Sequence, residues 1–221
     1  MYGFDVSSQV AAFAAFAVVA ALLTVTPGVD TVLVLRTTLA VDRRTGLVAA
    51  AGIQTGILAW ACAAGLGVAA LLAASTTAYT VLKVAGAAYL AGLGLWLLWQ
   101  AARGHGVAHG VAQGSEPAPA LSLRRSYSQG LITNLLNPKI GVFYVTLLPQ
   151  FVVRGQPVLL ICLGLALVHV VLGVLWFLAV TWLATRLGEV LRRRSVVRAL
   201  DRVTGVVFLA FAARLALSQR P

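Results

Sequence analysis

Residues 155–185 carry no charged side chain and read GQPVLLICLGLALVHVVLGVLWFLAVTWLAT. A helix needs about 20 predominantly apolar residues to cross the hydrocarbon core of a bilayer. This stretch exceeds that length, and it therefore predicts a membrane-spanning helix over about residues 156–185.

The composition of the whole chain agrees with this prediction. Of its 221 residues, 60% are hydrophobic and only 10% are charged, whereas about 25% of the residues of a soluble domain are charged. The mean hydropathy is +0.93. So few polar residues cannot cover a soluble domain, which argues against a cytosolic enzyme or a nucleic-acid-binding domain. The sequence predicts an all-α polytopic membrane protein.

Charge-free or nearly charge-free stretches mark the other expected spans. They predict six transmembrane helices at about residues 8–35, 46–73, 79–102, 127–152, 156–185 and 199–217. The one long connection is rich in Gly, Pro, Ala and Ser, which indicates a flexible, solvated linker. The expected organisation is a first three-helix unit (1–102), a linker (103–126) and a second three-helix unit (127–221).

The net charge of +11 comes from 17 Lys and Arg residues against 6 Asp and Glu. On the six-helix reading, 12 of these cations lie at the odd-numbered loops, 4 lie on the opposite side, and Lys139 lies within a span. Short loops rich in Lys and Arg stay in the cytoplasm. The sequence therefore predicts odd-numbered loops in the cytoplasm and both termini outside.

The two halves of the chain resemble each other. Residues 83–91 read KVAGAAYLA and residues 202–210 read RVTGVVFLA. Pro27 and Pro138 each interrupt the first expected helix of a half. Because each half has three helices, the second half would enter the membrane upside down, and inverted repeats are typical of transporters. The alternative is a chance recurrence of a short pattern in apolar sequence.

In the first expected helix, Pro27 removes a backbone donor and Gly28 adds conformational freedom. Lipid offers no partners to backbone groups released by such a break, whereas a cavity lined by an unwound segment does. Asp30 follows, and an acidic residue in a span should face a cavity, a partner or the interface. There it could bind an ammonium group or carry a proton. A simple packing kink and an interfacial carboxylate are the alternatives.

The fourth expected helix carries Asn137-Pro138-Lys139. Proline again breaks the helix, and Asn137 offers both donors and acceptors. Lys139 lies between long apolar runs, and an intramembrane lysine is a functional candidate by default. It could pair with Asp30, accept a substrate carboxylate or change its protonation during transport.

Weaker polar candidates lie in other expected helices. Gln54 and His169 are expected to line the same cavity, and a histidine can exchange protons near neutral pH. Thr55 and Asn134 also lie in spans, and each of these polar groups could instead make only an interhelical hydrogen bond.

These residues also carry a resemblance. Residues 26–35 (TPGVDTVLVL) and Leu136-Asn137-Pro138-Lys139, followed by Phe143 and residues 148–151 (LPQF), resemble signatures of the lysine exporter and homoserine/threonine efflux (LysE/RhtB) family. Residues 52–56 (GIQTG) and 86–90 (GAAYL) also fit. Val29 departs from the family pattern, which has a second proline at that position, so substrate and kinetics do not transfer.

The resemblance implies a bacterial inner-membrane exporter of amino acids or close derivatives, driven by the proton motive force. It implies cavity roles for Pro27, Asp30, Asn137, Pro138 and Lys139. The expected partners are an amino-acid substrate, protons and membrane lipid, and no nucleic acid. The sequence leaves open whether the protein forms a homo-oligomer.

Two other classes remain at this stage. A small-cation or metal exporter would also have six helices. Hard cations prefer several oxygen ligands, however, and the expected spans contain no cluster of Asp, His or Cys. A membrane thiol-disulfide enzyme would use Cys62 and Cys162, which lack a CxxC spacing and are expected to be structural thiols. The leading prediction is a non-enzymatic transporter with no cofactor and no metal site. Its translocation site is expected to comprise Pro27, Gly28, Asp30, Gln54, Asn137, Pro138, Lys139 and His169.

Overall fold

The computed structural model describes residues 6–26, 28–74, 76–103, 122–152, 157–184, 186 and 194–217. Within these ranges the chain is helical and contains no strand. The helices are α1 (Val6–Val25), α2 (Val29–Ala40), α3 (Arg43–Ala74), α4 (Thr76–Arg103), α6 (Leu123–Leu135), α7 (Pro138–Val142), α8 (Val158–Trp182) and α10 (Arg194–Leu217). A π-helical turn, η1 (Phe143–Leu147), and a 3-10 turn, η2 (Leu148–Phe151), follow α7.

Two helices in the described part of the chain are long and apolar enough to cross a membrane by themselves. They are α3, over Arg43–Gly67, and α8. A third span results if α1 and α2 are counted as one helix bent by 50° at its break. The first expected helix, 8–35, is therefore interrupted, and the expected helix over 127–152 is divided into α6, α7, η1 and η2.

The start of α3 differs slightly from the expected residue 46 for a local reason. The Asp42 carboxylate accepts a hydrogen bond from the backbone N–H of Thr45 at 2.7 Å. This contact caps the first turn of α3 and lowers the pKa of the Asp42 carboxyl. The helix consequently begins at Arg43.

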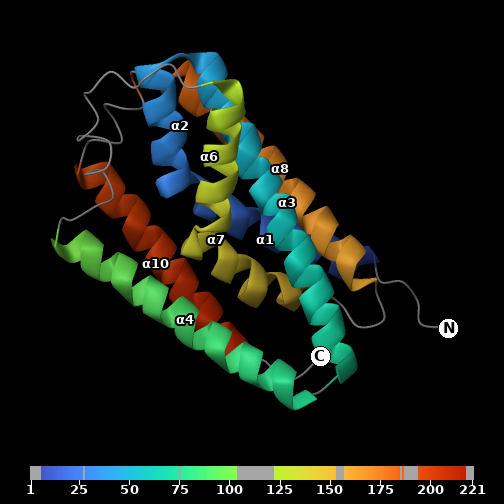
Figure 1. Ribbon diagram of the computed structural model, residues 1–221. Coiled ribbons are helices and arrows are strands. Elements are labelled where there is room, and N and C mark those ends of the chain that lie inside the picture. The colour runs from blue at the N-terminus through green and yellow to red at the C-terminus, as the bar shows by residue number, and fades with distance from the viewer. Residues whose placement is uncertain are drawn as a thin grey trace.

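α3 packs closely against α6 and α8 (Figure 1). Glycines permit the close approach to α6: Gly130 lies against the backbone carbonyl of Ala49, and Gly52 lies against that of Tyr127. Small residues allow this kind of backbone contact between membrane helices. The buried Ser126 hydroxyl adds a hydrogen bond to the carbonyl of Thr45 at 2.8 Å.

α4 and α10 lie side by side and run in opposite directions (Figure 1). A side chain at Gly94 would meet the carbonyl of Gly205, and one at Gly205 would meet the carbonyl of Gly94. These two helices contain the two segments that resemble each other in sequence, 83–91 and 202–210.

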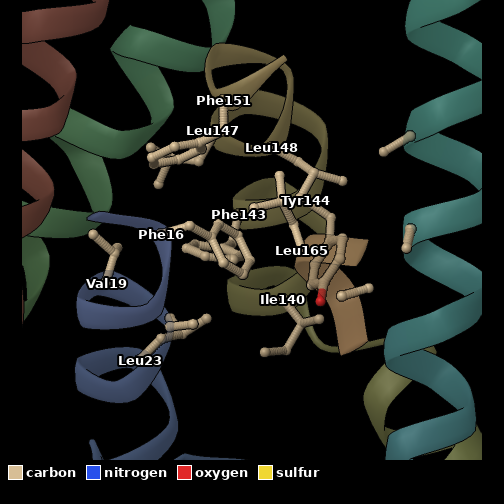
Figure 2. Close-up of a cluster of buried hydrophobic side chains, with 14 of the residues drawn as sticks. Phe16, Val19, Leu23, Ile140, Phe143, Tyr144, Leu147, Leu148, Phe151 and Leu165 are labelled. Atoms are coloured by element: carbon tan, nitrogen blue, oxygen red, sulfur yellow. The ribbon is translucent and has the colours of Figure 1, made fainter. Parts of the chain in front are cut away.

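A buried apolar cluster holds the irregular segment α7–η2 against α1 and α8 (Figure 2). Phe16 of α1 packs edge-to-face on Phe151 of η2, with ring centroids 5.4 Å apart. Phe143 and Tyr144 of η1 and Leu165 of α8 belong to the same cluster. Because these side chains are almost fully buried, the cluster fixes the position of α7 relative to the end of α1.

Candidate functional site

The first helix break lies between α1 and α2. The N–H and the hydroxyl of Thr26 both donate to the carbonyl of Leu22, at 3.0 and 2.6 Å. Pro27 lies outside the described residues, but a proline has no N–H and therefore cannot donate to the carbonyl of Leu23 four residues earlier. Gly28 is the N-cap of α2 in an extended conformation, and its carbonyl accepts from Val32 at 3.0 Å.

The second break lies between α6 and α7, and its sequence explains its geometry. The Asn137 side chain is the N-cap of α7 and accepts a hydrogen bond from the N–H of Lys139 at 3.1 Å. Pro138 occupies the first helical position, where a missing N–H does no harm. The carbonyl of Asn137 accepts from the N–H groups of Ile140 and Gly141 at 3.1 and 3.0 Å.

The Lys139 side chain joins the two breaks. Its ammonium group donates to the carbonyl of Leu23 at 3.0 Å and to that of Thr26 at 3.1 Å. Lys139 therefore supplies the Leu23 carbonyl with a donor that Pro27 cannot provide. The negative end of the α1 dipole also lies at these carbonyls, so the position favours a cation.

Asp30 lies in the first turn of α2, where the helix dipole favours a negative charge. Its side chain is 8% exposed. One carboxylate oxygen accepts a hydrogen bond from the Asn134 side chain of α6 at 2.8 Å. Asn137 and Lys139 line the same cavity as Asp30. The two oppositely charged side chains thus share one site. The Asp30 carboxylate lies at the N-terminal end of α2, and the Lys139 ammonium group lies at the C-terminal end of α1.

A small cavity of about 30 Å³ lies between the two breaks. It is bordered by the segment around the first break, by α7 and by one face of α8, with a contribution from α3. Its lining includes these residues predicted from sequence: Gly28, Asp30, Asn137, Lys139 and His169. Its other lining residues are Leu23, Thr24, Thr26, Thr31, Ile57, Ile140, Gly173 and Phe177.

Two other predicted site residues do not line the cavity. Gln54 is buried on α3, and its amide lies against Gly173, which does line it. Neither amide atom of Gln54 has a hydrogen-bond partner among the described residues. Pro138 is exposed and occupies the first position of α7, so its place is at the helix start and not in the cavity lining. Both cysteines, Cys62 and Cys162, are free.

His169 is 2% exposed and interacts with a residue that sequence reasoning missed. The Tyr144 hydroxyl and His169 Nδ1 are 3.0 Å apart and share a hydrogen bond. Tyr144 is fully buried in η1, and its ring lies nearly parallel to the imidazole, with centroids 5.8 Å apart. π-Helical turns occur frequently at functional sites. The π-helical turn is the feature that draws attention to Tyr144, and an apolar sequence does not reveal it.

α8 also reaches the first break through a tryptophan. Trp176 Nε1 donates to the Thr31 hydroxyl at 3.2 Å. A second tryptophan, Trp60 of α3, donates to the backbone carbonyl of Asn134 at 3.4 Å.

Within the described ranges, no group of three or more His, Cys, Asp or Glu side chains is placed to hold a metal ion.

These features define a helical, multi-pass membrane protein with a polar cavity at two broken helices. The family model for the LysE type translocator matches residues 21–219, and the chain therefore belongs to the LysE family. The resemblance found in the sequence is thereby confirmed.

Several relatives have named activities. The homoserine/homoserine lactone efflux protein of Salmonella typhimurium is 31% identical over 202 residues, which are 91% of this chain and 94% of that protein. The leucine efflux protein of an Enterobacter species is 30% identical over 92% of this chain and 94% of its own length. The threonine efflux protein of Escherichia coli is 30% identical over 63% and 66%, respectively. No solved structure matches the chain.

The site yields a stability prediction for Asn134→Ala. This change removes the donor to Asp30 and leaves a buried acceptor unsatisfied, which should destabilise the protein by about 1–3 kcal/mol. The control is Thr55→Ala, which removes the exposed hydrogen bond from Tyr127 and should have a smaller effect. Thermal unfolding of the purified protein in detergent measures both. Equal melting temperatures of the two variants would contradict the assigned role of Asn134.

Proposed function

We propose that this protein is an inner-membrane secondary transporter that exports amino acids or close derivatives in exchange for protons. The observation that carries the proposal is the convergence of Lys139, Asp30 and backbone carbonyls of α1 on one cavity. An amino acid is a zwitterion, and this site offers a partner for each of its charges. The LysE family and its relatives named as amino-acid efflux proteins support the same substrate class.

In this proposal the substrate carboxylate binds the Lys139 ammonium group. The substrate amino group binds Asp30 or backbone carbonyls at the first break. Gly28, Asn137 and His169 line the same space, whereas Pro27 and Pro138 interrupt the helices that form it. Gln54 is proposed to face the substrate once α8 moves away from it.

The size of the cavity supports alternating access. About 10–15 Å³ of such space is needed for each water molecule, so 30 Å³ accommodates about two waters and no amino acid. Substrate binding therefore requires helices around the breaks to separate. Inward proton movement would drive the cycle with about 2.3 kcal/mol per charge per 100 mV. Asp30 and His169 are the proposed proton carriers.

The proposal includes six spans arranged as two inverted repeats, with the first unit at residues 1–102, a linker at 103–126 and the second unit at 127–221. The antiparallel contact of α4 and α10 through Gly94 and Gly205 supports it. Two halves related by an axis in the membrane plane would place their equivalent third helices antiparallel.

The proposed orientation places both termini outside. A C-terminal alkaline phosphatase fusion should therefore be active in cells, because this enzyme folds only outside the cytoplasm, and a C-terminal green fluorescent protein fusion exported by the same route should remain dark. The opposite pattern would place the C-terminus in the cytoplasm and overturn the orientation inferred from the Arg-rich loops.

The function is tested by overexpression in cells challenged with a panel of toxic amino acids and analogues. Wild-type protein should give resistance and extracellular accumulation of at least one of them. Lys139→Ala should abolish export without preventing insertion, because the cavity loses its cation. Arg36→Ala, which changes an exposed residue of α2, is the matched control and should export normally. Normal export by Lys139→Ala would contradict the proposed site.

The same panel distinguishes the alternative, a small-cation or metal exporter. Such a protein would give resistance to metal salts alone. Resistance to amino acids, with no change in metal tolerance, is the result expected here.

A further inference from the structure

The C-terminal end of α1 forms an unusual acceptor site. The carbonyl of Leu23 cannot receive the ordinary helical hydrogen bond, because the residue four positions later is Pro27. The carbonyl of Thr26 lies beyond Val25, the last residue of α1. Both Leu23 and Thr26 line the cavity. The negative end of the helix dipole adds to the charge that these two oxygens present.

A primary ammonium group already occupies this acceptor pair. Lys139 Nζ lies 3.0 and 3.1 Å from the two carbonyl oxygens, which is good hydrogen-bond geometry. Lys139 is the second residue of the short helix α7. Its half-buried side chain extends toward α1 and places the ammonium group at the negative end of that helix.

We propose that the Leu23 and Thr26 carbonyls form the subsite for the amino group of the substrate, and that Lys139 is a tethered occupant which the substrate displaces. This inference rests on the proposed function. The substrate ammonium and the lysine ammonium are the same chemical group, each with three N–H donors. Displacement of Lys139 makes the carbonyl pair available to the substrate and vacates the space that the ammonium group occupied.

The exchange also gives Lys139 two partners in turn, first the carbonyls at the end of α1 and then the substrate carboxylate. The displaced ammonium remains on α7, at the edge of the cavity, and there it can bind the substrate carboxylate. One substrate molecule would thus replace the contact between Lys139 and the carbonyls by two contacts. Its ammonium group would bind the carbonyls, and its carboxylate would bind Lys139. A substrate without a primary amino group would leave Lys139 in place.

The competing explanation is that Lys139 is a permanent clamp between α1 and α7. The two explanations differ in wild-type protein, where an exported amino acid should expose Lys139 to acetylation by excess acetic anhydride, read by mass spectrometry of the Lys139 peptide, whereas a permanent clamp would leave its reactivity unchanged. The displacement also requires the carbonyl pair to bind a free ammonium group, and methylammonium chloride tests this, because it carries the ammonium group without a carboxylate. Tetramethylammonium chloride is the matched control, because it carries the same charge but no N–H donor. Both are added at equal ionic strength to purified Lys139→Ala in detergent, and thermal unfolding is recorded.

Methylammonium should raise the melting temperature of Lys139→Ala by several degrees in a saturable manner, and tetramethylammonium should not. Wild-type protein should show no such difference, since its own lysine fills the site. Lys139→Val, which is shorter than lysine and leaves room for the ion, serves if Lys139→Ala does not fold. The double variant Lys139→Ala/Asp30→Asn should retain the methylammonium effect, because the carbonyls rather than the Asp30 carboxylate bind the ion.

Equal effects of the two salts, no effect of either, or loss of the effect with Asp30→Asn would each overturn the proposed subsite. Any of these results combined with amino-acid export by wild-type protein would leave the proposed function intact. Absence of amino-acid export by wild-type protein would overturn the proposed function itself.

Discussion

The site depends on the contact between the Lys139 ammonium group and the carbonyls at the end of α1. A helix that ends inside an apolar environment leaves carbonyls that lipid cannot satisfy. The lysine satisfies them from another helix, and its own charge is stabilised by the same oxygens. A residue of the second break therefore satisfies the carbonyls of the first break, and this contact holds the two broken helices together.

The surrounding structure maintains this arrangement. The aromatic cluster around Phe16 and Phe143 holds the irregular segment after α7 against α1. On the other side, Asn134 of α6 donates to Asp30 at the start of α2. The close α3–α6 packing through Gly52 and Gly130 positions α6 for that bond. Packed helices thus hold a polar cavity whose own backbone is irregular.

Much of the site could be predicted from the sequence because its signals are chemical. Prolines within apolar runs mark breaks in the helices. An acid three residues after one proline and a single lysine after the other are rare inside membrane helices. The structure places Asp30, Asn137 and Lys139 at one cavity, as this pattern predicts. Their roles in transport remain proposals, as do the six spans and the inverted repeat.

Other features could not be predicted because they depend on helix rotation and on backbone atoms. Pro27 predicts that a backbone carbonyl loses its helical donor, but no sequence pattern indicates that Lys139 binds the carbonyls of Leu23 and Thr26. The hydrogen bond between Tyr144 and His169 joins a π-helical turn to α8, and the sequence does not reveal that turn. Gln54 was expected to line the cavity, but the turn of α3 on which it lies places its amide against Gly173 instead.

The central claim, that an exported amino acid occupies the cavity between the two breaks, is tested most directly by protection of a single cysteine. Thr24→Cys, which lies in the cavity lining, is introduced into protein with Cys62 and Cys162 changed to Ala. Ala40→Cys, at the exposed end of α2, is the control. The account predicts that an exported amino acid slows thiol labelling at position 24 and not at position 40. Unchanged labelling at position 24, in a variant that still exports that amino acid, would contradict it.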